Sequence, residues 1–65
     1  MIQIFDCDDQ ALMWEGSVPD LLALARDTDD GPLLDVALSI DDGATAGFLI
    51  CWPNGRPKMT VEVMA

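Results

Sequence analysis

The chain contains no histidine and no tyrosine, and only three of its 65 residues are basic. Without histidine, the sequence lacks the side chain that most often acts as a general base near neutral pH. The only serines are Ser17 and Ser39, and neither they nor the cysteines Cys7 and Cys51 have a neighbouring base in sequence to activate them. This inventory predicts a protein that is not an enzyme and that carries no cofactor.

Cysteine is also scarce. Two cysteines are too few for a secreted disulfide framework, and without histidine or further cysteines they cannot complete a zinc site. We expect Cys7 and Cys51 to be reduced and largely buried. A disulfide between them stays open as an alternative, because the topology predicted below brings both to one end of the molecule.

Long apolar runs are absent as well. No segment approaches the roughly 20 apolar residues that cross a bilayer, and the N-terminus lacks the basic and apolar regions of a signal peptide. The sequence therefore predicts a cytoplasmic protein that does not bind membranes.

Acidic residues dominate the charge. Twelve acids, ten of them aspartate, give a formal charge of −9. Such self-repulsion costs folding free energy, and it indicates either a partner with a basic surface or selection for solubility in high salt. The same charge disfavours direct binding to nucleic acid or to anionic lipid.

Half of the chain, 51%, is nevertheless hydrophobic, which is more than acidic disordered tails contain. The chain is too short for more than one domain, and it has no repeat or linker. We therefore treat residues 1–65 as a single folded α+β domain.

The first half of the chain predicts two strands and a helix. Residues 1–5 and 11–15 are short β-type runs joined by a turn over residues 6–10, and Gly16 ends the second run. Ser17, Pro19 and Asp20 form the pattern of a capped helix start. Helical spacing then gives one apolar face, made by Val18, Leu21, Leu22 and Ala25.

The second half predicts three strands. From Leu33 to Ile40, apolar residues alternate with Asp35, Ala37 and Ser39, which is a period of two. A turn at residues 41–43 leads to a central strand over 45–52, and a turn at 53–55 leads to a last strand over 58–64. In that last strand Lys58, Thr60 and Glu62 are expected to face outward.

These elements predict a small antiparallel sheet in the order ββαβββ, with one helix packed on one face. If the first strand runs upward, the turns after the first strand, after the helix and at residues 52–56 all lie at the top. Asp41 and Asp42 then lie at the other end. One helix covers only one face, so apolar residues from Phe48 to Trp52 are expected to be partly exposed, and a homodimer is possible.

The segment Asp27 to Gly31 resembles the start of a calcium loop, but it fails the pattern. Its glycine arrives one position early, and no acid lies where the loop's bidentate glutamate belongs. We assign no metal site, although a weak divalent site built from two aspartate clusters stays open. Ordinary turn chemistry is the simpler interpretation of these aspartates.

The carboxylates can instead be read as surrogate phosphates. Duplex DNA carries two negative charges per base pair, so twelve carboxylates match about six base pairs. A groove lined by lysine and arginine would attract such a body. Trp14 and Trp52 would add contacts if exposed, but core or sheet-edge positions are the simpler expectation for both.

In size, acidity and α+β pattern, the chain resembles the small acidic anti-CRISPR proteins of phages that act as DNA mimics. The resemblance carries no sequence motif, so it transfers no functional residue. It implies inhibition of a nucleic-acid-binding complex inside a host bacterial cell, with a type I CRISPR surveillance complex as the expected partner.

The alternative is a salt-adapted acidic protein-interaction module. Salt adaptation predicts acids spread evenly over the surface and a fold that requires molar salt, whereas mimicry predicts a biased acidic face. Clustering at residues 6–9, 27–30 and 41–42 favours mimicry. The predicted contact residues are the six acids at the top, with two on the outer sheet face as extensions: Asp6, Asp8, Asp9, Asp27, Asp29 and Asp30, then Asp35 and Glu62.

Three cations complete the charge inventory: Arg26, Arg56 and Lys58. Arg56 follows the turn at the top and is a candidate to pair with the aspartates there. An exposed pair contributes only about 0–1 kcal/mol, so we expect local charge balance from these residues.

Overall fold

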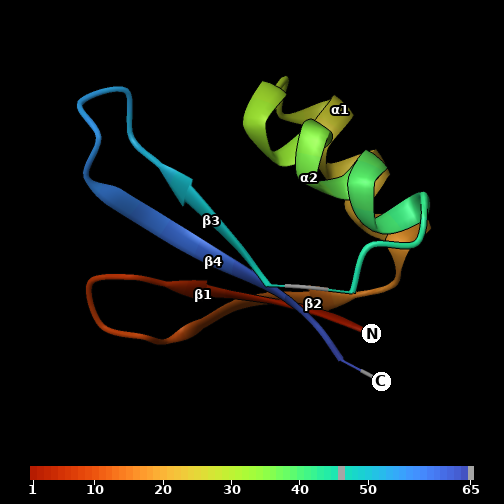
Figure 1. Cartoon of the computed structure of the whole chain (residues 1–65), viewed down its shortest axis with the longest axis horizontal. Coiled ribbons are helices and arrows are strands. Elements are labelled where there is room, and N and C mark those ends of the chain that lie inside the picture. The colour runs from red at the N-terminus through yellow and green to blue at the C-terminus, as the bar shows by residue number, and fades with distance from the viewer. Residues whose placement is uncertain (46, 65) are drawn as a thin grey trace.

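The computed structural model describes residues 1–45 and 47–64 and contains four strands and two helices in the described part. In chain order they are β1 (Ile2–Asp6), β2 (Leu12–Gly16), α1 (Val18–Asp27), α2 (Gly31–Asp41), β3 (Phe48–Cys51) and β4 (Pro57–Val63). The strands form one antiparallel sheet in the order β2-β1-β4-β3. Both helices lie on the same side of this sheet (Figure 1).

The α+β class and the antiparallel sheet are confirmed, but the predicted order ββαβββ is wrong. The observed order is ββααββ, because the segment predicted as a third strand is the helix α2. The sheet accordingly has four strands, and a pair of helices covers it instead of one.

Helix α1 begins where the sequence predicts. Ser17 is its N-cap, and the Asp20 N–H donates to Ser17 Oγ at 3.4 Å. Pro19 occupies the first turn, where its missing N–H costs nothing. Leu21 and Ala25 lie on the predicted apolar face and are buried against the sheet.

Helix α2 forms because its helical signals outweigh the alternation seen in the sequence. Asp30 is the N-cap, and its Oδ1 accepts the Leu33 N–H at 3.1 Å. Pro32 follows in the first turn. The buried residues Leu33, Ala37 and Ile40 are spaced i, i+4, i+7, so they form one helical face.

Strands β3 and β4 are joined by a tight turn at residues 52–56 and pair with a register shift. Strand β3 was predicted as a central strand over residues 45–52, but it is a four-residue edge strand. Ile50 pairs with Met59 and Cys51 with Pro57, so Lys58 has no partner across the strands. This is the geometry of a β-bulge, which re-aims a side chain.

The core lies between the sheet and the helices. Its buried residues come from three strands and both helices: Ile2, Ile4, Leu21, Ala25, Leu33, Ala37, Ile40, Ile50, Met59 and Val61. The other face of the sheet has no helix over it in the described part of the chain. Leu49 is 59% exposed and Trp52 is 49% exposed, so the predicted partial exposure of residues 48–52 is confirmed for these two.

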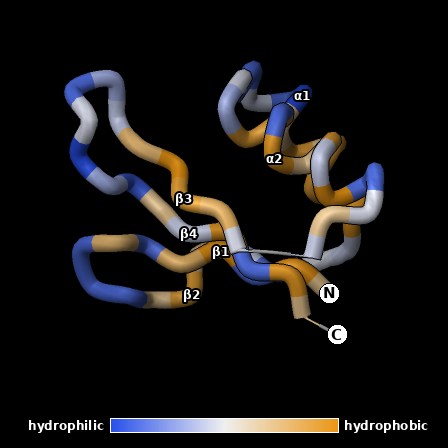
Figure 2. The backbone as a smooth tube through the Cα atoms, viewed as in Figure 1, coloured by the Kyte–Doolittle hydropathy of each residue, from blue (hydrophilic) through white to orange (hydrophobic). Residues whose placement is uncertain are grey.

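Hydropathy follows this layering. Figure 2 shows hydrophobic backbone along the strands and the inner parts of the helices, and hydrophilic stretches at the turns. Neither described helix is long and apolar enough to cross a membrane.

Candidate acidic interface

Three turns lie at one end of the molecule. Strand β1 runs toward Asp6, helix α1 runs toward Asp27, and strand β3 runs toward Cys51, so the turns that follow them share the end away from the chain termini (Figure 1). Helix α2 runs back from this end and leaves Asp41 and Asp42 at the opposite one. We call the six carboxylates of the first two turns the acidic end: Asp6, Asp8, Asp9, Asp27, Asp29 and Asp30.

The β1–β2 turn is shaped by its own aspartates. The Asp8 N–H donates to Asp6 Oδ1 at 2.7 Å, and the Ala11 N–H donates to Asp9 Oδ1 at 2.9 Å. Gln10 adopts a positive φ of 59°, which closes the turn. Asp6 and Asp9 therefore have structural roles, whereas Asp8 is exposed and its carboxylate makes no hydrogen bond or ion pair within the described residues.

The α1–α2 turn divides its aspartates in the same way. Asp29 follows Thr28, the C-cap of α1, and has a left-handed φ of 52°, a conformation that aspartate tolerates better than most residues. Asp30 is half-buried and caps α2. Asp27 and Asp29 are exposed, and their carboxylates take part in no hydrogen bond or ion pair with the described part of the chain.

Lys58 connects the three turns. Its Nζ lies 3.9 Å from Asp30 Oδ2 and 4.7 Å from the centroid of the Trp52 ring. Its carbonyl oxygen accepts the Cys7 N–H at 3.2 Å. Lys58 was predicted to face outward, but the bulge leaves it half-buried and reaching toward the helices. Lys58, and not Arg56, makes the ion pair at this end.

The two tryptophans differ. Trp14 is half-buried and packs against the core, as the simpler expectation has it. Trp52 lies in the β3–β4 turn, is exposed, and forms the platform below the Lys58 ammonium. A cation held over an indole face gains electrostatic stabilisation, so Trp52 also contributes to the position of Lys58.

Asp35 and Glu62 do not share the outer sheet face that was predicted for both. Asp35 lies on the exposed side of α2, because its segment is a helix. Glu62 lies on β4, on the sheet face turned away from the helices, as predicted. The two carboxylates are thus on opposite sides of the molecule and cannot both extend one contact surface with the acidic end.

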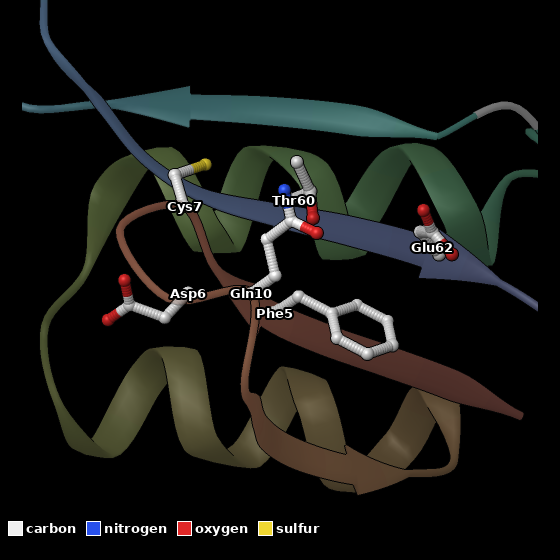
Figure 3. Close-up of a pocket in the computed structure, with 6 residues that line it drawn as sticks. All are labelled: Phe5, Asp6, Cys7, Gln10, Thr60 and Glu62. Carbon is white, nitrogen blue, oxygen red and sulfur yellow. The ribbon is translucent and has the colours of Figure 1, made fainter.

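The outer sheet face carries a shallow hollow of about 380 Å³. Figure 3 shows its lining residues, which come from β1, the β1–β2 turn and β4: Phe5, Asp6, Cys7, Gln10, Thr60 and Glu62. The hollow is open to solvent, and the Cys7 thiol has no histidine or lysine side chain among these neighbours to activate it. The hollow is a candidate contact surface on the outer face of the sheet.

Both thiols are free. Cys7 follows β1, whereas Cys51 lies on β3 and pairs with Pro57 of β4. Since β4 runs between them, their Cα atoms are about two strand spacings apart, roughly 10 Å, and a disulfide needs less than about 7 Å. The two cysteines do lie at the same end of the sheet, but Cys51 is exposed and Cys7 half-buried, so the expectation that both are largely buried is wrong.

Within residues 1–45 and 47–64, no three acidic or cysteine side chains come close enough to hold a metal ion. The two aspartate clusters lie on separate turns, with Lys58 reaching one of them. Comparisons with protein-family models, with curated proteins and with solved structures found no match to this chain.

Proposed function

We propose that this chain inhibits a nucleic-acid-binding protein by placing its acidic end in that protein's basic groove. The observation that carries the proposal is the state of Asp8, Asp27 and Asp29. All three are exposed, and none of their carboxylates accepts a hydrogen bond or forms an ion pair within the described residues. Asp27 is the last residue of α1, and Asp8 and Asp29 lie in turns next to the structural aspartates Asp6 and Asp30, so pairing them costs little backbone conformational entropy.

Carboxylates held in this way suit arginine-rich grooves. Arginine binds a carboxylate through two parallel hydrogen bonds, as it does a phosphate. A chain with a formal charge of −9 is also steered toward a basic surface over distances comparable to the Debye length, about 8 Å at physiological salt. The resemblance to acidic anti-CRISPR proteins makes a type I CRISPR surveillance complex the first target to test, at its site for duplex DNA.

The test is a gel-shift competition with a purified type I surveillance complex and its duplex target at 50 and 200 mM salt. We expect the shifted band to disappear when the protein is added before the DNA, and to persist when it is added afterwards. The inhibition should weaken at the higher salt. An unchanged band at a large molar excess would reject this complex as the target.

Two variants with equal charge locate the contact. D8N/D27N/D29N removes three unengaged carboxylates from the acidic end, and D20N/D35N/D41N removes three exposed carboxylates from elsewhere. Both variants change the formal charge from −9 to −6. We expect the first to raise the inhibitory concentration about tenfold or more and the second much less, mainly through the association rate. Equal effects would show that total charge, and not the acidic end, determines binding.

The second candidate is a salt-adapted module that binds another protein through its sheet. The uncovered sheet face favours it, since Leu12 and Leu49 are both about half exposed there, at 49% and 59%. The other six acids are also distributed away from the acidic end: Glu15, Asp20, Asp35, Asp41, Asp42 and Glu62. Thermal unfolding at 10 mM and 2 M NaCl separates the two functions. A chain that folds only in molar salt supports the salt-adapted module, and a chain already folded at 10 mM supports the decoy.

A further inference from the structure

Strand β3 is an unprotected edge of the sheet. It is the outermost strand on its side, as Figure 1 shows, and no described segment pairs with its outer backbone groups. Natural proteins protect such edges with charges, prolines or a covering segment, because exposed edges pair with other chains. Phe48–Cys51 contains neither a charge nor a proline. The opposite edge strand, β2, carries Glu15.

The surface beside this edge is apolar. Leu49 is 59% exposed, and Cys51 is exposed as well. In β3 the buried residue Ile50 alternates with these two, so both project from the face that no helix covers. Edge pairing would therefore bury apolar side chains in addition to satisfying backbone groups.

The charge near this edge differs from that of the rest of the chain. Residues 43–61 contain no acid and two of the three cations, Arg56 and Lys58, although the whole chain carries twelve acids. Lys58 is already paired with Asp30, whereas Arg56 is exposed and makes no ion pair within the described part of the chain. The hairpin of β3 and β4 is therefore locally basic, and an acidic surface would complement its charge.

Asp41 and Asp42 supply an acidic element with no partner of its own. They end and cap α2, at the helix terminus where negative charge is unfavourable. The last turn contains no basic residue, and neither carboxylate makes a hydrogen bond or an ion pair with a described residue. An arginine from outside this chain would offset that cost.

We propose that β3 pairs antiparallel with β3 of a second copy, about a two-fold axis perpendicular to the sheet. The pair forms one continuous sheet of eight strands with all four helices on one face. The rotation places the β3–β4 turn of each copy beside the first residues of β3 of the other, at the end of the molecule where α2 ends. Each Arg56 then lies next to the other copy's Asp41 and Asp42. A register centred on Leu49 keeps the buried face of both copies on the same side.

The interface is small, because β3 has only four residues and stable interfaces bury about 1,200 Å² or more. Two bodies of charge −9 also repel each other outside the contact. We therefore expect a reversible dimer with a dissociation constant on the order of 100 µM. The proposal is independent of the inhibitory function, since it concerns the purified chain alone.

The first experiment measures mass by sedimentation equilibrium between 10 µM and 1 mM in 150 mM NaCl under reducing conditions. We expect monomer at the low end and mostly dimer at the high end. Leu49→Lys should raise the dissociation constant at least tenfold. Leu12→Lys is the matched control, because Leu12 is 49% exposed on the other edge strand, and it should leave the constant unchanged within twofold. Monomer throughout, or an effect of Leu12→Lys alone, would overturn the proposal.

A charge exchange tests the predicted contact directly. R56E places like charges in both contacts of its own dimer, and D42R replaces one of the two acids in each contact with a positive charge. Each variant alone should therefore dimerise at least tenfold more weakly than the parent. In an equimolar mixture, both contacts of the heterodimer join opposite charges, and the mixture should dimerise. R56E mixed with D8R is the matched control, because D8R has the same formal charge as D42R but keeps Arg56 and Asp42. D8R should dimerise with itself as the parent does, and it should draw no R56E into heterodimers. A D42R mixture that stays monomeric while both chains show native circular dichroism would refute the pairing.

Discussion

The two helices cover the same sheet, but the charges at their ends have opposite relations to the helix dipole. Helix α1 has Asp20 in its first turn and Arg26 in its last, so both charges match the helix dipole. Helix α2 has no acid in its first turn beyond the cap, and it ends with Asp41 followed by Asp42. The charges of α1 serve the stability of the fold, whereas the terminal acids of α2 oppose it. Such a cost is retained where a residue serves something other than folding.

The largest expected effect on stability is the loss of a buried leucine, and it should be similar in the two helices. Leu21 of α1 and Leu33 of α2 are both buried, so replacing either with alanine should cost about 2–5 kcal/mol. A core of this size supplies roughly 3–5 kcal/mol in total, so both variants should be largely unfolded at 37 °C. Urea denaturation followed by circular dichroism measures the loss. Leu38→Ala, at a residue 45% exposed on α2, should change stability by no more than about 0.5 kcal/mol. If Leu33→Ala costs no more than Leu38→Ala, α2 is not packed as described.

The N-caps should differ by a smaller amount. Asp30 accepts the Leu33 N–H at 3.1 Å in a half-buried site and also pairs with Lys58, whereas Ser17 accepts at a longer 3.4 Å in an exposed one. Asp30→Ala should therefore cost about 1–2 kcal/mol and Ser17→Ala about 0.5 kcal/mol. Asp30→Asn separates the two roles of Asp30, because it keeps the capping oxygen and removes the charge. Its cost should stay below about 1 kcal/mol, and a cost equal to that of alanine would assign the stabilisation to the ion pair.

The smallest expected effect comes from neutralising an aspartate at a helix end, and the resulting change in stability should have opposite signs in the two helices. Asp41→Asn and Asp42→Asn remove negative charge from the C-terminal end of α2, and each should stabilise the fold by about 0.3–1 kcal/mol. Asp20→Asn removes a favourable charge from α1 and should destabilise it by a similar amount. Thermal melts at 10 µM protein, where the proposed dimer is dissociated, measure both changes. Molar NaCl should reduce both shifts, and shifts of the same sign would contradict the dipole argument.

The helices also show why half of the fold was predictable. In α1 the cap, the proline and the apolar spacing of Leu21 and Ala25 all indicate a helix, and no competing pattern is present. In α2 the alternation of Leu34, Val36, Leu38 and Ile40 imitates a strand, although the helical face is formed by Leu33, Ala37 and Ile40. The deciding features lay just upstream. Asp30 and Pro32 form a helix start, but Asp30 is also the last acid of the segment that resembles a calcium loop.

The acidic end was predictable to a similar degree. Its turns were expected at one end, and they lie there because α2 runs in the same direction as the strand that was predicted in its place. The contacts of Lys58 with Asp30 and Trp52 were not predictable from sequence. They depend on a one-residue shift between β3 and β4, and nothing in the local sequence specifies that shift. Asp35 was misplaced for the same reason as α2, since its segment was assigned to the sheet.

Lys58 has a practical consequence for anyone who studies this protein on a surface or with a label. It is the only lysine in the chain, so reagents that attack primary amines have two targets, its side chain and the N-terminus. The N-terminal amine lies at the end away from the three turns (Figure 1). Coupling through the Lys58 amine would release Asp30 and Trp52 and attach the protein by the surface under study. Coupling through the N-terminal amine alone would leave that surface free.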